Sequence, residues 1–132
     1  MKILYAGDSP VGGSANYLLG VLKFLKAKTV HLSPDEKIKP SHLAAKFDAI
    51  IFSDFSKKQV PLAAEKLIIE QIHRGTGFMM AGGWGSFSGP FGGWRGSLLE
   101  REIFPVHCAK QDDRLNFPGG AHLILNTPHP MF

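Results

Sequence analysis

Short apolar runs alternate with longer segments of helical periodicity through the first 81 residues, and this alternation limits the folds that the chain can adopt. Four of the runs are predicted to be strands: residues 2–6, 28–32, 48–53 and 77–81. Residues 15–26 and 62–74 place apolar side chains on one helical stripe, and residues 41–46 are predicted to form a shorter helix. The repeated order of strand and helix predicts a parallel sheet that is covered by helices on both faces.

The remainder of the chain has weaker periodicity. Residues 97–102 predict one or two helical turns, and residues 103–108 and 122–125 predict further strands. The length of 132 residues fits one domain that spans residues 1–132. With 44% hydrophobic and 20% charged residues, the composition excludes an intrinsically disordered chain.

Composition also limits the partners that we expect. No apolar run reaches the ~18 residues of a membrane-spanning helix, and the first residues turn polar too early for a signal peptide, so we expect a cytoplasmic protein with no membrane partner. The net charge of +4 comes mainly from scattered lysines without aromatic residues between them, and we expect no nucleic-acid partner. The histidines lie on different predicted elements, and the single cysteine excludes an internal disulfide. We expect no metal and no other cofactor.

One window, residues 82–96, contains seven of the 15 glycines and both tryptophans. Together with loops 7–14 and 53–57 it should lie at the carboxyl edge of the sheet, where α/β folds bind ligands. Glycines allow close approach of a ligand, aromatic rings offer flat faces, and arginines grip carboxylate or phosphate groups. Alternatively, the aromatic residues pin the loop onto the sheet and the arginines pair with acids. The candidate ligand-binding residues are Asp8, Ser9, Ser14, Asp54, Gly82, Gly83, Trp84, Ser86, Trp94, Arg95 and Arg114.

Two short motifs precede the first predicted helix. The triplet Gly7-Asp8-Ser9 resembles the opening block of SGNH (GDSL-type) esterases, which implies that Ser9 is a nucleophile. That chemistry needs a histidine and an acid, but the late Asp-x-x-His block of those esterases is absent. The alternative is that Asp8 and Ser9 cap or turn the loop between the strand and the helix. The run GGSAN at residues 12–16 begins a helix and suits an anion, with plain capping by Ser14 as the alternative.

Four stretches spread over the whole chain resemble one known family in matching order. They are GDSPVGGSANYLL, FDAIIFSDF, GGWGSFSGPFGGWRGS and DDRLNFPGGA. The resemblance is to the glutamine amidotransferase-like family, a branch of the class I glutamine amidotransferase-like superfamily that also includes ThuA-like proteins. It implies a three-layer α/β/α sandwich with a mainly parallel, flavodoxin-like sheet, which agrees with the alternation of strands and helices.

Class I glutaminases of that superfamily carry a nucleophilic cysteine on a tight elbow after a strand, Gly-x-Cys-x-Gly. In this chain the run AGGWG at residues 81–85 fits the elbow, with Gly83 at the nucleophile position. The only cysteine, Cys108, is predicted to be a buried structural residue. We therefore expect no glutaminase activity from this chain, and the resemblance assigns no catalytic residue to it.

The superfamily takes its catalytic histidine and acid from the C-terminal part of the fold, and no His-x-Glu pairing is found here. Family members continue beyond a point equivalent to Phe132, so the resemblance implies a C-terminally truncated domain: a fragment, a truncated product or a naturally short relative. The expected function is that of an amidotransferase-like domain that binds an unknown small polar molecule, or a partner, at the carboxyl edge of the sheet. Alternatives are a serine hydrolase that uses Ser9 and a non-catalytic module that forms a homo-oligomer through an open edge strand.

Overall fold

The computed structural model describes residues 1–9, 13, 15–112, 117–122, 124 and 127–128. Four strands in this part of the chain form one sheet: β1 (Lys2–Gly7), β2 (Lys28–Leu32), β3 (Ala49–Ser53) and β4 (Gly77–Ala81). Neighbouring strands are parallel, and their order is β2-β1-β3-β4. The predicted parallel sheet is confirmed, and its strand order is that of flavodoxin-like folds.

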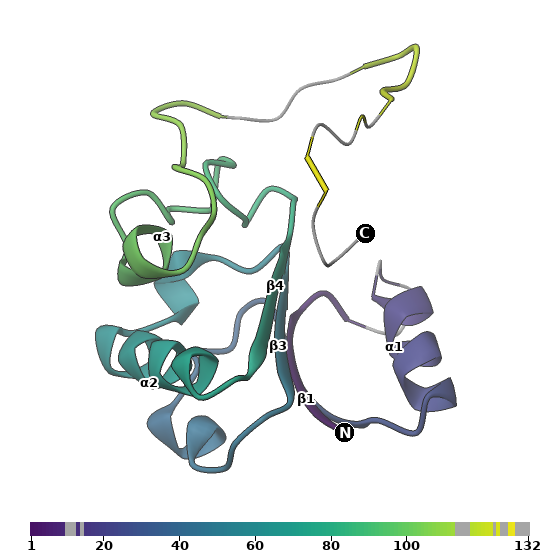
Figure 1. Ribbon diagram of the computed structural model, residues 1–132, viewed down its shortest axis with the longest axis vertical. Coiled ribbons are helices and arrows are strands. Elements are labelled where there is room, and N and C mark those ends of the chain that lie inside the picture. Colours follow the sequence, from purple (N-terminus) through teal and green to yellow (C-terminus); the bar gives the residue numbers. More distant parts are fainter. Residues whose placement is uncertain (10–12, 14, 113–116, 123, 125–126, 129–132) are drawn as a thin grey trace.

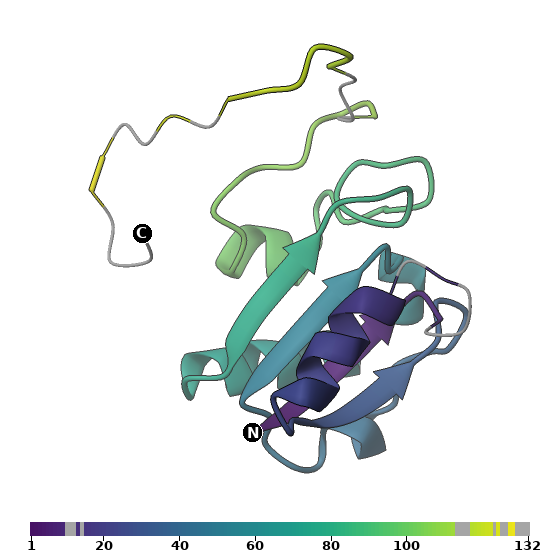
Figure 2. The ribbon, with the colours of Figure 1, turned by 90° about the vertical axis from the view of Figure 1, so that its right-hand side faces the viewer.

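Helices cover both faces of this sheet. Helix α1 (Asn16–Phe24) lies on one face, and α2 (Leu62–His73) and α3 (Leu98–Glu102) lie on the other (Figure 1). Two 3-10 turns, η1 (Pro40–Leu43) and η2 (Lys57–Gln59), precede β3 and α2 in the chain. Seen from the side of α1, the four strands run in the same direction behind the helix (Figure 2). The predicted three-layer α/β/α arrangement is therefore confirmed.

The two faces of the sheet carry separate apolar clusters, because side chains alternate between the faces along each strand. On the side of α2, Leu4, Ile50 and Phe52 are completely buried. On the side of α1, Tyr5 and Ile51 belong to a smaller cluster. The larger cluster also contains residues that follow β4, so the chain beyond the sheet is fixed onto the α2 face.

Polar side chains fix α2 against the segment that precedes β3. Gln71 accepts a hydrogen bond from the N–H of Phe47 at 2.9 Å and donates one to the carbonyl oxygen of Leu43 at 3.0 Å. The hydroxyl of Thr76 donates to the carbonyl oxygen of Phe47 at 2.7 Å. Gly75 follows the end of α2 with a φ of 92°, a positive value that glycine tolerates and that is common just after a helix.

The strand predicted over residues 103–108 is wrong. The N–H groups of Ile103 and Phe104 both donate to the carbonyl oxygen of Leu99 at 2.9 Å, which ends α3. The N–H of Cys108 donates to a side-chain carboxylate at 2.7 Å. Backbone donors that a strand would use for pairing are thus taken by a helix end and by a side chain.

Smaller differences affect the ends of the other elements. The helix predicted over residues 41–46 is the 3-10 turn η1. Helix α1 has Ala15 at its N-cap position, and the predicted cap Ser14 lies outside the described residues. The predicted helical turns at residues 97–102 are α3, which Ser97 caps by accepting the N–H of Glu100 at 3.1 Å. The strand predicted over residues 122–125 falls partly outside the described residues.

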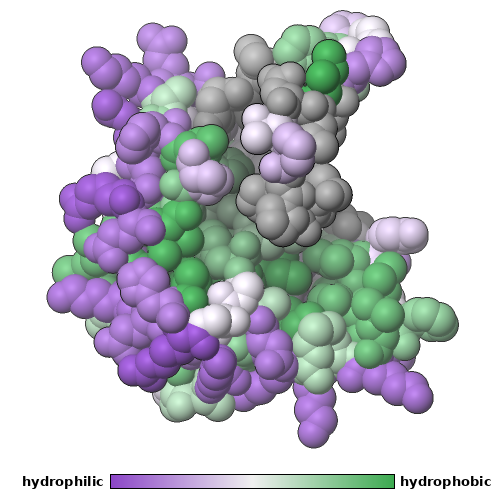
Figure 3. Space-filling view, in the orientation of Figure 1, coloured by the Kyte–Doolittle hydropathy of each residue, from purple (hydrophilic) through white to green (hydrophobic). Residues whose placement is uncertain are grey.

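Helix α1 leaves much apolar surface exposed. Tyr17 is 85%, Phe24 84% and Leu25 57% exposed, whereas Leu22 is buried against the sheet. Figure 3 shows hydrophobic residues gathered on the surface in this region, at the lower right of the view. None of the described helices is both long enough and apolar enough to cross a lipid bilayer.

Candidate functional site

Three loops leave the sheet side by side at its carboxyl edge. The last residues of β1, β3 and β4 are in register, since Gly7 pairs with Ser53 and Ser53 pairs with Ala81. The loops that follow start at Asp8, Asp54 and Gly82. The third of them, residues 82–96, is called the glycine–tryptophan loop below.

Asp54 ties the end of β3 to the glycine–tryptophan loop. Its φ is 54°, in the left-handed region that few side chains other than those of Asp and Asn tolerate. Its Oδ1 accepts a hydrogen bond from the N–H of Gly85. This charged acceptor holds the loop against the strand end, because hydrogen bonds to ionised groups are the stronger ones.

Gly83, at the position predicted for a nucleophile, lies directly against Asp54. Its φ is 154°, and a Cβ atom added there would be 2.6 Å from Oδ1 and 2.7 Å from Cγ of Asp54. A Cβ at Gly85 would be 2.7 Å from the carbonyl oxygen of the same aspartate. With Asp54 in this position, the elbow has no room for a cysteine side chain.

Two buried side chains pack the glycine–tryptophan loop onto the fold. Trp94 is completely buried, and its indole N–H donates to the carbonyl oxygens of Phe55 at 3.0 Å and Gly85 at 3.3 Å. Ser86 is also buried, and its hydroxyl donates to the carbonyl oxygen of Ala81 at 2.6 Å. The structure therefore gives Trp94 and Ser86, two of the predicted ligand-binding residues, packing contacts within the protein.

Trp84 and Phe91 form an exposed aromatic pair on the same loop. The two side chains are 57% and 59% exposed, and their rings stack with centroids 6.1 Å apart. The N–H of Phe91 donates to the carbonyl oxygen of Trp84 at 2.8 Å, and the hydroxyl of Ser56 donates to the carbonyl oxygen of Phe91 at 2.6 Å. Hydrogen-bonded backbone thus holds two apolar rings in contact with solvent.

A cavity of about 320 Å³, called the edge cavity, adjoins this aromatic pair. Its lining residues are Asp8, Pro34, Asp35, Asp54, Ser56, Lys58, Gln59, Gly85 and Phe91. Three carboxylates face one ammonium group here, so the charges favour a positively charged ligand group. Within the described part of the chain, no group of three or more His, Cys, Asp or Glu residues is placed to hold a metal ion.

A histidine and a tyrosine support the backbone behind Asp8. Nε2 of His31 lies 3.1 Å from the carbonyl oxygens of Gly7 and Asp8, and it carries the proton because both neighbours are acceptors. Burial raises the pKa of the Tyr5 hydroxyl, and the nearby charge of Asp8 adds to this shift. The hydroxyl of Tyr5 is therefore protonated at neutral pH.

The other predicted site residues have different surroundings. Ser9 is exposed beside the edge cavity residue Asp8, and Gly82 is exposed at the start of the glycine–tryptophan loop. Arg95 lies near the other end of that loop and lines a different cavity. Ser14 and Arg114 lie outside the described residues.

The predicted burial of Cys108 is confirmed. The residue is 6% exposed and belongs to the apolar cluster on the side of α2. Its N–H donates to Oε1 of Glu100, while Oε2 of Glu100 accepts the N–H of Gly96. Both hydrogen bonds lower the pKa of Glu100, and the one from Gly96 has the larger effect. Glu100 therefore stays ionised and fixes the backbone on both sides of α3.

A buried acid on α2, Glu65, was missed from the sequence. Its side chain is 2% exposed, and its Oε2 lies 3.2 Å from Nζ of Lys57. Its Oε1 accepts the N–H of Leu99 at 2.9 Å, so it joins η2, α2 and α3. The available signal was an acid on the apolar stripe of a predicted helix, three residues before Ile68.

Comparison with known proteins agrees with this architecture. Residues 13–132 match the family model described as "Putative glutamine amidotransferase". No curated protein matches the chain. The family match covers the parallel sheet from α1 onward and the whole glycine–tryptophan loop. Since the match spans almost the entire sequence, the chain belongs to this glutamine amidotransferase-like family.

Proposed function

We propose that this chain is an amidotransferase-like domain without glutaminase activity that binds a small polar ligand in the edge cavity. The observation that carries the proposal is the contact between Gly83 and Asp54 at the elbow. Glutaminase chemistry needs a thiolate there, but Gly83 has no side chain and Asp54 occupies the space that one would need. Cys108, the only thiol, is buried after α3.

The edge cavity favours a ligand that combines an ammonium group with an apolar face. Asp8, Asp35 and Asp54 place three carboxylates at the cavity against the single ammonium of Lys58. The exposed Trp84–Phe91 stack adjoins it and offers a flat surface to a ring or to a cation. A small organic amine matches both features, whereas a carboxylate would meet like charges.

The absence of glutaminase activity can be tested by measuring ammonia release from L-glutamine. We expect release at the rate of the protein-free buffer for both the wild-type protein and Cys108→Ser. Release above this rate that Cys108→Ser abolishes would contradict the proposal, because the buried thiol would then be the nucleophile.

Ligand binding can be tested with three probes of similar shape: benzylamine, benzyl alcohol and benzoate. We expect benzylamine to raise the melting temperature most and to bind saturably in titration calorimetry. Asp8→Asn and Trp84→Ala should each weaken binding about three- to tenfold, which is the effect expected from the loss of one charged or one aromatic contact. Glu102→Gln, an exposed acid on α3, is the matched control and should bind as the wild type does. No saturable binding, or benzoate binding as tightly as benzylamine, would refute this ligand class.

A second candidate function, homo-oligomerisation, is favoured by the exposed edge of the sheet. Among the described residues β4 pairs only with β3, and its sequence GFMMA carries no charge to discourage pairing. Met79 on this strand is 54% exposed. Light scattering would show a concentration-dependent dimer that Met79→Lys converts to monomer, and a monomer at high concentration would exclude this candidate.

The serine hydrolase alternative remains a prediction. Nε2 of His31, which is close in space to Asp8, bonds backbone carbonyl oxygens, so this nitrogen is not available as a base for Ser9. A fluorophosphonate probe should therefore leave the protein unlabelled. Labelling that Ser9→Ala removes would establish the hydrolase alternative instead.

A further inference from the structure

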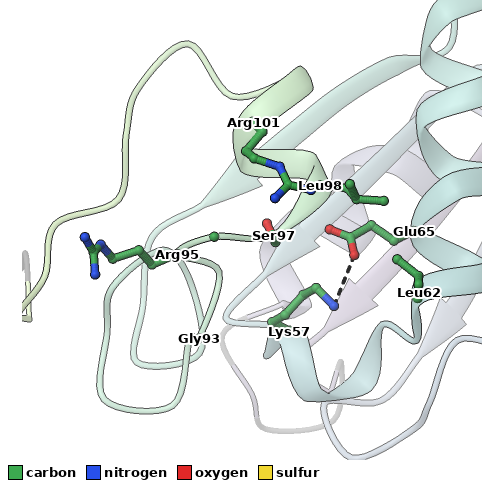
Figure 4. A pocket seen from close by; sticks show the side chains of 9 residues that line it. Lys57, Leu62, Glu65, Gly93, Arg95, Ser97, Leu98 and Arg101 are labelled. Carbon is green, nitrogen blue, oxygen red and sulfur yellow. Dashed lines mark ion pairs between the residues drawn. The ribbon is translucent and has the colours of Figure 1, made fainter.

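A second cavity, of about 370 Å³, lies between η2, the start of α2 and the segment that leads into α3 (Figure 4). Three basic side chains and one acidic side chain line it: those of Lys57, Arg95, Arg101 and Glu65. We call it the basic cavity. Its lining residues do not overlap with those of the edge cavity, so the two cavities are separate.

The single carboxylate of the basic cavity is used within the protein. One oxygen of Glu65 accepts the N–H of Leu99 at 2.9 Å, and the other lies 3.2 Å from Nζ of Lys57. The same Nζ donates to the carbonyl oxygen of Val60 at 2.9 Å. Lys57 and Glu65 therefore form a fixed pair whose two charges cancel.

The two arginines have no such partner in the described part of the chain. None of the ion pairs found there includes Arg95 or Arg101. Glu100, the neighbouring acid, already accepts hydrogen bonds from the N–H groups of Gly96 and Cys108. Two guanidinium charges thus remain at the cavity after the Lys57–Glu65 pair is balanced.

The arginines differ in direction. Figure 4 shows the guanidinium of Arg101 turned from α3 towards Ser97 and the cavity, whereas Arg95 extends away from it on the other side. Arg101 is therefore placed to contact a ligand directly. Arg95 contributes positive charge at the rim, where Coulomb attraction through water is weaker but still favours an anion.

We propose that the basic cavity binds a phosphate group, with Arg101 as its principal contact and Lys57 beside it. A planar guanidinium matches two oxygens of a phosphate in a bidentate pair of hydrogen bonds. A phosphate monoester carries a charge of about −1.5 to −2 at neutral pH, which balances the two unpaired guanidinium groups. The volume of about 370 Å³ leaves space for a small organic group on that phosphate.

The test is titration calorimetry at constant ionic strength with inorganic phosphate, glycerol 3-phosphate and acetate as probes. We expect saturable binding of at least one of the two phosphates and weaker binding of acetate. Arg101→Gln should weaken phosphate binding about tenfold, the size of one charge-assisted contact. Arg95→Gln should weaken it less, about threefold, since this side chain lies at the rim. Tighter binding of the ester would identify a phosphorylated metabolite as the ligand, and tighter binding of the inorganic ion would identify free phosphate.

The matched control is Arg74→Gln, which removes the same charge from an exposed position at the end of α2. Arg74→Gln should bind phosphate as the wild type does. Since Arg101 and Arg74 are both exposed, neither variant should lose the fold. Three results would overturn the proposal: no saturable phosphate binding, equal weakening by Arg101→Gln and Arg74→Gln, or acetate binding more tightly than both phosphates. Melting curves of each variant verify that the fold is retained.

Discussion

The packing of Gly83 against Asp54 makes a quantitative prediction about stability. In Gly83→Ala, the new Cβ would start 2.6 Å from Oδ1, 2.7 Å from Cγ and 3.0 Å from Cβ of Asp54. Overpacking of this kind costs about 1–3 kcal/mol, and a side chain at positive φ costs about 1–2 kcal/mol more. We therefore expect the free energy of unfolding to fall by about 2–5 kcal/mol, a large part of the ~5–15 kcal/mol of a typical domain.

The two contributions can be separated by removing the atoms that cause the clash. Asp54→Gly deletes all three atoms and by itself should cost about 1–2 kcal/mol, because the N–H of Gly85 loses its acceptor. In that background, Gly83→Ala should cost only the backbone part, about 1–2 kcal/mol. The coupling energy of the double-mutant cycle is then about 1–3 kcal/mol and measures the steric contact.

Urea denaturation followed by tryptophan fluorescence would measure these free energies. Gly82→Ala is the matched control, because a Cβ there meets nothing within 4 Å, and it should change stability by less than about 1 kcal/mol. A loss of stability in Gly83→Ala no larger than that in Gly82→Ala would contradict the predicted clash. An equal loss with and without the Asp54 side chain would also contradict it, since the clash would then play no part.

Three further predictions concern buried ionisable groups. Glu65→Gln leaves Lys57 without its counter-charge and should lower the free energy of unfolding by about 1–3 kcal/mol, whereas Glu70→Gln in an exposed ion pair should change it by less than about 0.5 kcal/mol, both by urea denaturation. The folded-state pKa of Glu100 is lowered, so its stabilisation is complete above the ordinary value of 4.5 and is lost as pH falls through the folded pKa; Glu100→Gln should therefore show a shallower loss of stability in acid. The folded-state pKa of Tyr5 is raised, so its stabilisation is complete below 10.0 and is lost as pH rises towards the folded pKa; Tyr5→Phe should show a shallower loss of stability in alkali.

Most of the fold could be predicted because its signals are local. The period of apolar residues and the glycine after α2 determine strands and helices within a few residues of where they occur. The failure at residues 103–108 has the opposite origin. Its apolar side chains fit a strand, but the carbonyl oxygen of Leu99 and the carboxylate of Glu100 take its donors, and these acceptors come from the neighbouring helix. A one-dimensional pattern carries no information about such competition for backbone groups.

The candidate site was predictable in place but not in the roles of its residues. Trp84 and Trp94 each follow a glycine in the same loop, yet one is 57% exposed and the other is completely buried. The difference comes from tertiary contacts. The indole N–H of Trp94 donates to the carbonyl oxygens of Phe55 and Gly85, and the N–H of Gly85 donates to the carboxylate of Asp54. Packing therefore accounts for Trp94 and for the glycine that lies against Asp54. Trp84 instead stacks on Phe91 and stays exposed beside the edge cavity, and the ligand proposal depends on the carboxylates of that cavity and on this exposed pair of rings.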